Sequence, residues 1–182
     1  MKAFLNKKFL FGIAALSFAM ASSAQSNNFS YSGYSIGYMH TNRLSSSDSN
    51  GINFSGSFKM TENLFASANV LAQSDIYRGK VGLGVRAPVA SNIDVYAIGG
   101  VARNTNFDKD WGAALTLGGK TMLAPKLELN LGGSYVNLNT NSIEKEIFAS
   151  LGYALSKDLV IRTRSFRATG VQGYELSLGS QF

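Results

Sequence analysis

The amino-acid sequence predicts an all-β fold: a closed antiparallel transmembrane β-barrel of ten strands, with eight strands and longer hairpins as the alternative. Apolar and polar residues alternate in segments of about 9 to 13 residues, the length of a tilted strand that crosses a bilayer. Beyond the N-terminal segment, no apolar run is long enough for a transmembrane helix. The mean hydropathy of +0.02 is typical of strands that combine a lipid face with a lumen face.

The N-terminal residues 1–24 have the features of a cleavable signal peptide, so we expect one barrel domain at 25–182. A basic start precedes an apolar run at 9–20, which is too short to span a membrane. Removing the three lysines of this segment lowers the formal charge from +6 to +3, because 14 basic residues then stand against 11 acidic ones. This small excess gives no support to a nucleic-acid partner. The absence of cysteine excludes a disulfide framework.

Ten segments carry the alternation, and we expect strands at 30–40, 51–60, 64–73, 77–86, 93–103, 111–122, 127–138, 143–155, 159–167 and 172–182. An even number of strands places both termini on the periplasmic side, together with the connections at 61–63, 87–92, 124–126 and 156–158. The two longest connections, 41–50 and 104–110, then face outward. Pro88 and Pro125 fall between the expected strands, where no ladder hydrogen bond is lost.

The two ends of the barrel domain carry further signals. Phe29 and Tyr31 have the opposite parity to the apolar residues of the first strand, which predicts a bulge or a periplasmic lead-in near Gly33. The last strand ends on Phe182. This terminal aromatic residue resembles the carboxy-terminal signal by which outer-membrane barrels are recognised for assembly, and the resemblance implies that role for it.

Aromatic residues on the expected lipid face gather near the two ends of the strands, as in the two interfacial girdles of membrane barrels. The outer girdle is predicted to contain Tyr38, Tyr77, Trp111, Tyr135 and Tyr174, and the periplasmic girdle Phe58, Tyr153 and Phe182.

Charged residues of the strands have inward parity, and we expect Lys145 to be the only charge on the lipid face. The predicted lumen network contains Lys59, Arg78, Lys80, Arg86, Asp94, Lys120, Glu128, Glu144, Glu146, Arg162, Arg164 and Glu175. Such a lumen could weakly repel cations and pass small solutes. The favoured interpretation is a self-neutralising network that fills a narrow interior, because ten strands enclose little more space than side chains occupy.

No constellation in the sequence predicts an enzyme, a cofactor or a metal ion. His40 could act as a general base at the outer mouth beside one of four aspartates, but no serine follows in a His-x-Ser arrangement, and a rim residue is favoured. The aspartates considered are Asp48, Asp75, Asp108 and Asp110. The glycines of 79–84 are expected in a strand rather than in a phosphate loop, since no helix follows them.

Several segments together resemble a family of small bacterial outer-membrane β-barrel proteins, some of which carry the name sulfation-dependent quorum-sensing factor, and more loosely the OmpA/OmpX-type barrels. The matching segments are 29–31 with 37–38, 51–57, 63–65, 82–85, 92–96, 126–129 and 178–182. The resemblance implies a monomer in the bacterial outer membrane, surrounded by lipid and lipopolysaccharide. It also implies the barrel-assembly machinery and periplasmic chaperones as partners during biogenesis.

The function expected from these patterns is that of a structural component of the envelope or of a narrow porin-like passage for small polar solutes. The alternative is a surface adhesion protein that acts through the loops at 41–50 and 104–110. Both loops are short and of mixed charge, which weakens this alternative.

Overall fold

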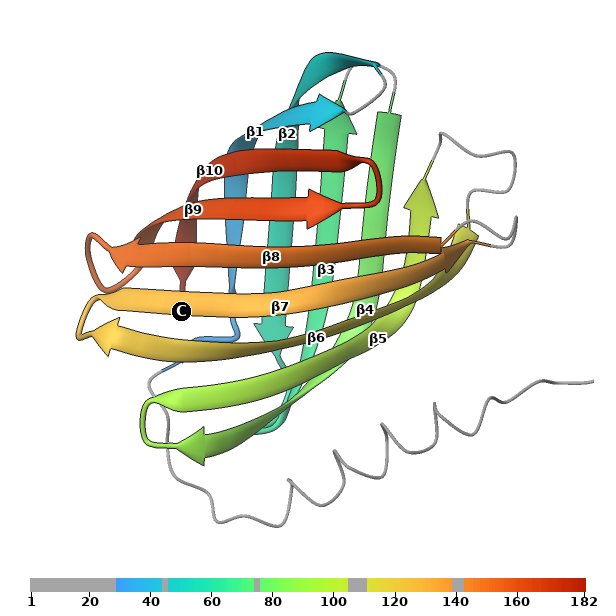
Figure 1. Ribbon diagram of the computed structural model, residues 1–182. Helices are drawn as coiled ribbons and strands as arrows, with labels where there is room; N and C mark the ends of the chain where they lie inside the picture. Colours follow the sequence, from blue (N-terminus) through green and yellow to red (C-terminus); the bar gives the residue numbers. More distant parts are fainter. Residues whose placement is uncertain (1–28, 44–45, 74–75, 105–110, 139–142) are drawn as a thin grey trace, which may run out of the picture.

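The computed structural model describes residues 29–43, 46–73, 76–104, 111–138 and 143–182, which form a closed antiparallel β-barrel (Figure 1). Its strands are β1 (Gly33–Arg43), β2 (Ser46–Lys59), β3 (Leu64–Gln73), β4 (Ile76–Ala90), β5 (Ile93–Asn104), β6 (Trp111–Ala124), β7 (Leu127–Leu138), β8 (Ile143–Ala154), β9 (Leu159–Ala168) and β10 (Val171–Gln181). The predicted signal peptide at 1–24 lies outside the described residues. Among those residues, no helix is long and apolar enough to cross a membrane.

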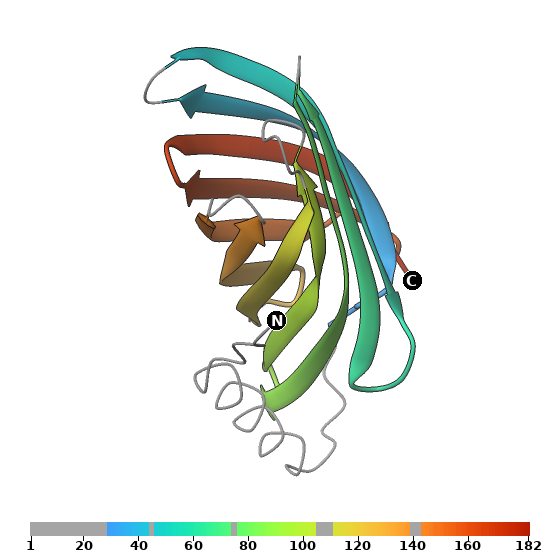
Figure 2. The same ribbon diagram turned by 90° about the vertical axis from the view of Figure 1, so that its right-hand side faces the viewer.

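The sheet closes because β1 pairs with β10, in a register that runs from Gly33 opposite Gln181 to Arg43 opposite Val171. This closure confirms the predicted fold class and the ten strands, and it excludes eight. In Figure 1, strands β7 to β10 cross β2 to β4 behind them at a steep angle, because barrel strands tilt by about 35–45° from the axis. Figure 2 shows the curvature of the same wall from the side.

One end of the barrel carries the start of β1, the end of β10 and four short turns, which lie at 60–63, 91–92, 125–126 and 155–158. We call it the periplasmic end, as the sequence predicts, and the opposite end the outer end. The turns at the left of Figure 1 belong to the periplasmic end.

The predicted outer loop at 41–50 is wrong. Strand β1 continues to Arg43 and β2 begins at Ser46, so this region is a hairpin in which Thr41 pairs with Ser49. The hydroxyl of Thr41 also donates to the carbonyl of Ser49 at 3.1 Å. Polar residues on both faces hide such a strand from a search for apolar alternation, because a strand that extends beyond the lipid needs no apolar face.

The predicted connection at 87–92 is also too long. Strand β4 continues through Pro88 to Ala90, and the register with β5 shifts between these two residues. Such an irregularity near the end of a strand accommodates a residue that has no backbone N–H. Pro125 lies in a turn, as predicted.

The two faces of the wall differ in the way that the alternation predicts. In β1, Ile36 and Tyr38 are each 57% exposed, whereas Ser35, which precedes them, and Met39, which follows them, are buried. The same exposed apolar positions recur on every strand and form a continuous apolar outer surface. An exposed apolar surface of this extent is found where a protein faces lipid or a partner.

Glycines on the inner face make room for large side chains of the paired strand. A Cβ atom at any of four glycines would overlap the aromatic ring of its direct cross-strand neighbour. These pairs are Gly84 with Phe65, Gly118 with Tyr96, Gly132 with Phe148 and Gly173 with Phe166. The rings therefore lie against the wall and leave part of the interior open.

A charge on the outer face should be costly in the middle of a strand and tolerated near its end. Leu176→Arg, halfway along β10, is expected to lower the free energy of unfolding by about 2–4 kcal/mol, because the side chain enters hydrocarbon. Urea unfolding of the protein in lipid vesicles measures this loss. The control is Tyr174→Arg on the same face nearer the outer end, with a loss below about 1 kcal/mol. Equal losses would contradict a lipid-facing β10.

Candidate functional site: the barrel interior

The interior of the barrel contains a cavity of about 360 Å³. Inward side chains from all ten strands line it, together with residues 30–32 that precede β1. Its volume lies at the lower end of the range of about 300–1,000 Å³ that is common for small-molecule sites. The lining is mixed, with serines, asparagines and charged groups beside aromatic rings, so the cavity suits a small polar solute.

At the periplasmic end, Arg86 and Asp94 form a buried ion pair. Nη1 of Arg86 donates to Oδ2 of Asp94 at 2.9 Å, and the aspartate side chain is completely buried. Nε of Arg86 also donates to the carbonyl oxygen of Glu62 at 2.6 Å. The guanidinium thus connects β5 to the turn between β2 and β3.

Further along the lumen, Glu128 lies between two cations. Its Oε1 is 3.8 Å from Nζ of Lys120 and 3.7 Å from Nη2 of Arg162. Glu128 of β7 and Arg162 of β9 lie on either side of β8, and both are paired with Gly152 of β8. Because Gly152 has no side chain, β8 places no side chain between them at this position. This position allows the arginine to reach across β8 to the glutamate.

A second polar chain crosses the seam where the barrel closes. Arg164 forms ion pairs with Glu146 and, at 3.7 Å, with Glu175. The amide of Asn53 donates to Glu175 at 2.9 Å, and the amide of Asn69 donates to Asn53 at 2.7 Å. These contacts connect β8, β9 and β10 to β2 and β3 through the interior.

Gly37 of β1 gives that polar chain its path across the seam. It pairs with Ser177 of β10 on one side and with Asn53 of β2 on the other. A Cβ atom at this glycine would come within 2.8 Å of Oε1 of Glu175. Glycine at this position therefore lets the carboxylate pass over β1.

Near the outer end, Arg78 and Asn104 both bind Glu144. The guanidinium of Arg78 lies 3.6 Å from Oε1 of Glu144, and the amide of Asn104 donates to the same oxygen at 2.8 Å. The network therefore has ion pairs near both ends of the barrel and at intermediate heights.

Lys80 differs from the other inward cations. Its ammonium donates to the hydroxyl of Ser134 at 3.2 Å, and in the described part of the chain no carboxylate lies within ion-pair distance of it. The five other inward cations each have a carboxylate partner; they are Arg78, Arg86, Lys120, Arg162 and Arg164. With five inward carboxylates against six cations, the lumen described here has an excess of one positive charge.

The segment that precedes β1 enters the barrel and closes much of its periplasmic end. Phe29 and Tyr31 are buried in a cluster with Phe65 and Tyr96. The ring of Tyr31 has two cations near its centre, the guanidinium of Arg86 at 5.1 Å and the ammonium of Lys120 at 4.4 Å. Contacts of this kind are worth about 0.5–2 kcal/mol each.

Hydrogen bonds of Ser30 and Ser32 with the ends of β2 and β10 hold the same segment in place. The Ser30 hydroxyl donates to the carbonyl oxygen of Phe182 at 3.1 Å, and the N–H of Phe182 donates to Ser32 at 3.2 Å. The N–H of Lys59 donates to the Ser32 hydroxyl at 2.9 Å. The opposite parity of Phe29 and Tyr31 in the sequence predicted a lead-in near Gly33, and the structure has one before this residue. The inward position of the two rings was not predicted.

Solved structures share this architecture at low sequence identity. The KdgM porin in complex with disordered oligogalacturonate is 13% identical with a TM-score of 0.53, and the match covers 81% of this chain and 99% of that chain. The outer membrane channel COG4313 from Pseudomonas putida F1 is 8% identical with a TM-score of 0.54, and the match covers 88% of this chain and 100% of that chain. The chain has the fold of a transmembrane β-barrel.

Neither protein-family models nor curated protein sequences match the chain. The structural likeness supports the broad class, an outer-membrane-type β-barrel. The closer resemblance to OmpA/OmpX-type barrels and to sulfation-dependent quorum-sensing factors stays a prediction.

Most residues of the predicted lumen network lie in the interior. Nine of them line the cavity, and Arg86 and Asp94 are buried at its periplasmic end. Lys59 is the exception, because it is exposed at the very end of β2. The sequence did not indicate the inward apolar clusters of Met39, Leu71 and Phe166 and of Ala102, Val136 and Leu138.

The prediction that Lys145 is the only charge on the outer face is wrong. Arg103 and Arg167 have the outward parity of their strands and are exposed. The guanidinium of Arg103 lies 5.5 Å from the centre of the Trp111 ring. Both arginines lie near the outer ends of β5 and β9, where a long side chain can reach water or headgroups.

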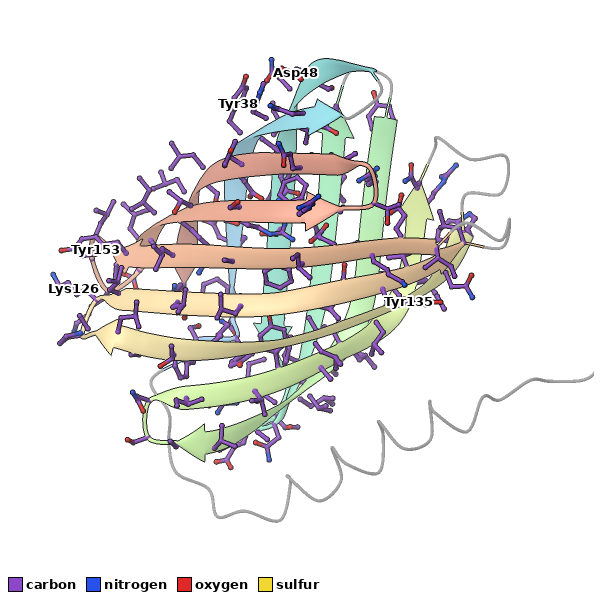
Figure 3. The ribbon with its side chains drawn as sticks, in the orientation of Figure 1. Tyr38, Asp48, Lys126, Tyr135 and Tyr153 are labelled. Carbon is purple, nitrogen blue, oxygen red and sulfur yellow. The ribbon has the colours of Figure 1, made fainter. Side chains whose placement is uncertain are left out.

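The eight residues of the predicted girdles are all exposed on the wall; they are Tyr38, Tyr77, Trp111, Tyr135, Tyr174, Phe58, Tyr153 and Phe182. Figure 3 shows Tyr135 and Tyr153 at opposite ends of the front wall, and Tyr38 in the upper part of the view. The assembly role of Phe182 stays a prediction.

His40 lies on the outer face of β1 and not in the cavity. Its Nδ1 is 2.7 Å from the side-chain oxygen of Asn50, and its Nε2 is 3.9 Å from Asp48. Asp75, Asp108 and Asp110 lie outside the described residues. Within the described ranges, no three metal-ligating side chains come together.

The Arg86–Asp94 pair should be important for stability. Asp94→Asn leaves a buried guanidinium without its counter-charge, which is expected to lower the free energy of unfolding by about 3–5 kcal/mol. Denaturant unfolding in vesicles measures the loss. Asp158→Asn, in an exposed periplasmic turn, is the matched control and should change stability by less than about 0.5 kcal/mol. A loss at Asp94 no larger than in the control would contradict the structural role of the pair.

Proposed function

We propose that the protein is a narrow channel of the bacterial outer membrane that passes small polar solutes and favours anions. The observation that carries this proposal is the cavity inside a closed barrel, with charged, polar and apolar side chains of all ten strands around it. The fold shared with a porin and an outer membrane channel supports it. No enzymatic activity is part of the proposal.

The charge of the lumen supports a preference for anions. The two opposite charges of each ion pair inside the barrel are only a few ångströms apart, so they largely cancel and their long-range field is weak. In the part of the chain that the structure describes, the positive charge of Lys80 has no carboxylate at ion-pair distance to balance it, and this side chain lines the cavity. One positive charge in a narrow, low-dielectric tube attracts anions and repels cations more strongly than the same charge on an open surface.

The lead-in at residues 29–32 would form the narrowest part of such a channel. Its two rings share the periplasmic end with Phe65 and Tyr96, and the ion pair of Arg86 lies beside them. A channel of this kind would have a small conductance that depends on these rings.

The second candidate is a structural barrel of the envelope that conducts nothing. It is favoured by the same lead-in and by the apolar clusters inside the outer half of the barrel. Surface adhesion has less support, because one of its two expected loops, 41–50, is a paired hairpin. Outer-membrane location, export by the N-terminal segment and assembly through Phe182 belong to the proposal.

Replacing Lys80 should change the ion preference of the channel. In planar bilayers under a salt gradient, the wild-type protein is expected to favour anions. Lys80→Gln should remove this preference and Lys80→Glu should reverse it, because the excess charge of the lumen changes sign. The reversal potential measures the effect.

Lys157→Glu is the matched control, since it makes the same charge change in an exposed periplasmic turn. It should leave the reversal potential nearly unchanged at physiological salt, where exposed charges are screened beyond about 8 Å. Silence of the wild-type protein in the bilayer would favour the structural barrel. A steady channel that is indifferent to Lys80→Glu would contradict the role of this lysine.

Removing the rings of the lead-in should widen the periplasmic end. Phe29→Ala with Tyr31→Ala is expected to raise the single-channel conductance, because both side chains are buried in the lumen. Tyr34→Ala removes a ring of the same size from the outer face of β1 and should leave conductance unchanged. An equal conductance in the wild-type protein and the double variant would show that the constriction lies elsewhere.

A further inference from the structure

Three cations with described side chains lie on the outer face near the outer end of the barrel, two of them on the neighbouring strands β8 and β9. They are Arg103 of β5, Lys145 of β8 and Arg167 of β9. A cation on this face costs about 2–4 kcal/mol at the membrane midplane and little near the surface. Their position near the ends of the strands therefore places them at the depth of lipid headgroups.

Lys145 and Arg167 are neighbours across the sheet. Ile147 is paired with Arg167, and Lys145 is two residues before Ile147 on the same face. Diagonal neighbours of this kind are about 7–8 Å apart at their Cα atoms, close enough for both side chains to bind one anion. Among the described residues, neither cation has a carboxylate within ion-pair distance.

A groove of about 300 Å³ lies on the wall; Arg167 lines it, and so does Ile147, which is two residues from Lys145. It crosses β8, β9 and β10 at Ala149 and Ser165, two small outward residues that are paired with each other, and Ser165 is paired in turn with Tyr174. The outward residues that line it are Ile147, Ala149, Ser165, Arg167, Gln172 and Tyr174. Arg167 and Gln172 are nearest the outer end, whereas Ala149 lies further toward the middle of the wall.

The groove thus carries its charge toward the membrane surface, at Arg167, and has only uncharged side chains toward the hydrocarbon, at Ala149, Ser165 and Tyr174. A lipid with an anionic headgroup has the same polarity along its length. Tyr135, paired with Lys145, adds an interfacial aromatic residue at that depth. The charge and the polarity of the groove indicate a lipid with a phosphate group and no positive charge of its own.

We propose that Lys145 and Arg167 bind a phosphate of lipid A, the phosphorylated lipid of the outer leaflet, and that one of its acyl chains lies in the groove at Ala149 and Ser165. The inference rests on the proposed outer-membrane location. Lipid A is chosen because a phosphomonoester carries a charge of about −1.5 to −2 at neutral pH. The phosphodiester of a zwitterionic phospholipid is partly neutralised by its own amine.

The test measures lipid binding to the full barrel in detergent micelles by native mass spectrometry, with lipid A, dephosphorylated lipid A and phosphatidylglycerol as probes. Wild-type protein is expected to bind lipid A at least about tenfold more tightly than the dephosphorylated form. Lys145→Gln with Arg167→Gln should lose this difference. Lys126→Gln with Lys157→Gln, which neutralises two cations of the periplasmic turns, should keep it.

A second variant tests the groove without changing charge. Ala149→Trp places a large side chain in it and should weaken lipid A binding while Lys145 and Arg167 stay in place. Heat-modifiable migration in gels establishes that each variant is folded. Conductance should be unaffected in all of them because these residues face away from the lumen, so failure of the lipid site and failure of the channel are distinguishable.

The proposal is overturned if the double variant at 145 and 167 binds lipid A as tightly as the wild-type protein. It is also overturned if dephosphorylated lipid A or phosphatidylglycerol binds equally well, since the site would then not recognise the phosphomonoester. Unchanged binding in Ala149→Trp would exclude the groove as the acyl-chain site.

Discussion

The backbone of a membrane-spanning sheet has no water with which to form hydrogen bonds, so every N–H and C=O group in the hydrocarbon must find a partner within the protein. The pairing of β1 with β10 meets this requirement, because it removes the two free edges that a ten-stranded open sheet would have. Closure fixes the inner circumference, and the inward side chains must then share a narrow space. The composition of the lumen follows from that limit.

Two kinds of side-chain arrangement make the narrow interior compatible with many charged groups. Aromatic rings lie flat over paired glycines, as Phe65 does over Gly84, and so occupy space near the wall. Ionic side chains reach over glycines to partners two strands away, as Arg162 does toward Glu128 across Gly152. The inner glycines therefore do more than permit curvature, since they set which side chains can meet.

The alternation of apolar and polar residues predicted much of the fold, because parity alone decides which face of a strand a side chain occupies. Parity does not show how far along the barrel axis a side chain lies or which side chains of other strands it meets. The partners of Arg164 and Glu175 could therefore not be predicted. The hairpin at 41–50 was missed because its strands extend beyond the lipid and need no apolar face. The outward position of Arg103 and Arg167 was not predicted, because every charged residue of a strand was expected to face the lumen. Near the ends of the strands, however, a charged side chain can also lie on the outer face.

Lys80 connects the packing of the lumen to its proposed function. An ammonium group buried in a dry interior without a counter-charge is unfavourable by several kcal/mol, so such a lysine would be a source of instability in a completely filled barrel. The cavity that Lys80 lines contains polar and charged groups beside apolar ones and is large enough to hold water, and water there would solvate the charge. A hydrated lumen with one excess cation is the condition that a narrow anion-preferring passage needs. The narrowest part of such a passage would be the periplasmic end, where Arg86 and Lys120 both lie near the ring of Tyr31.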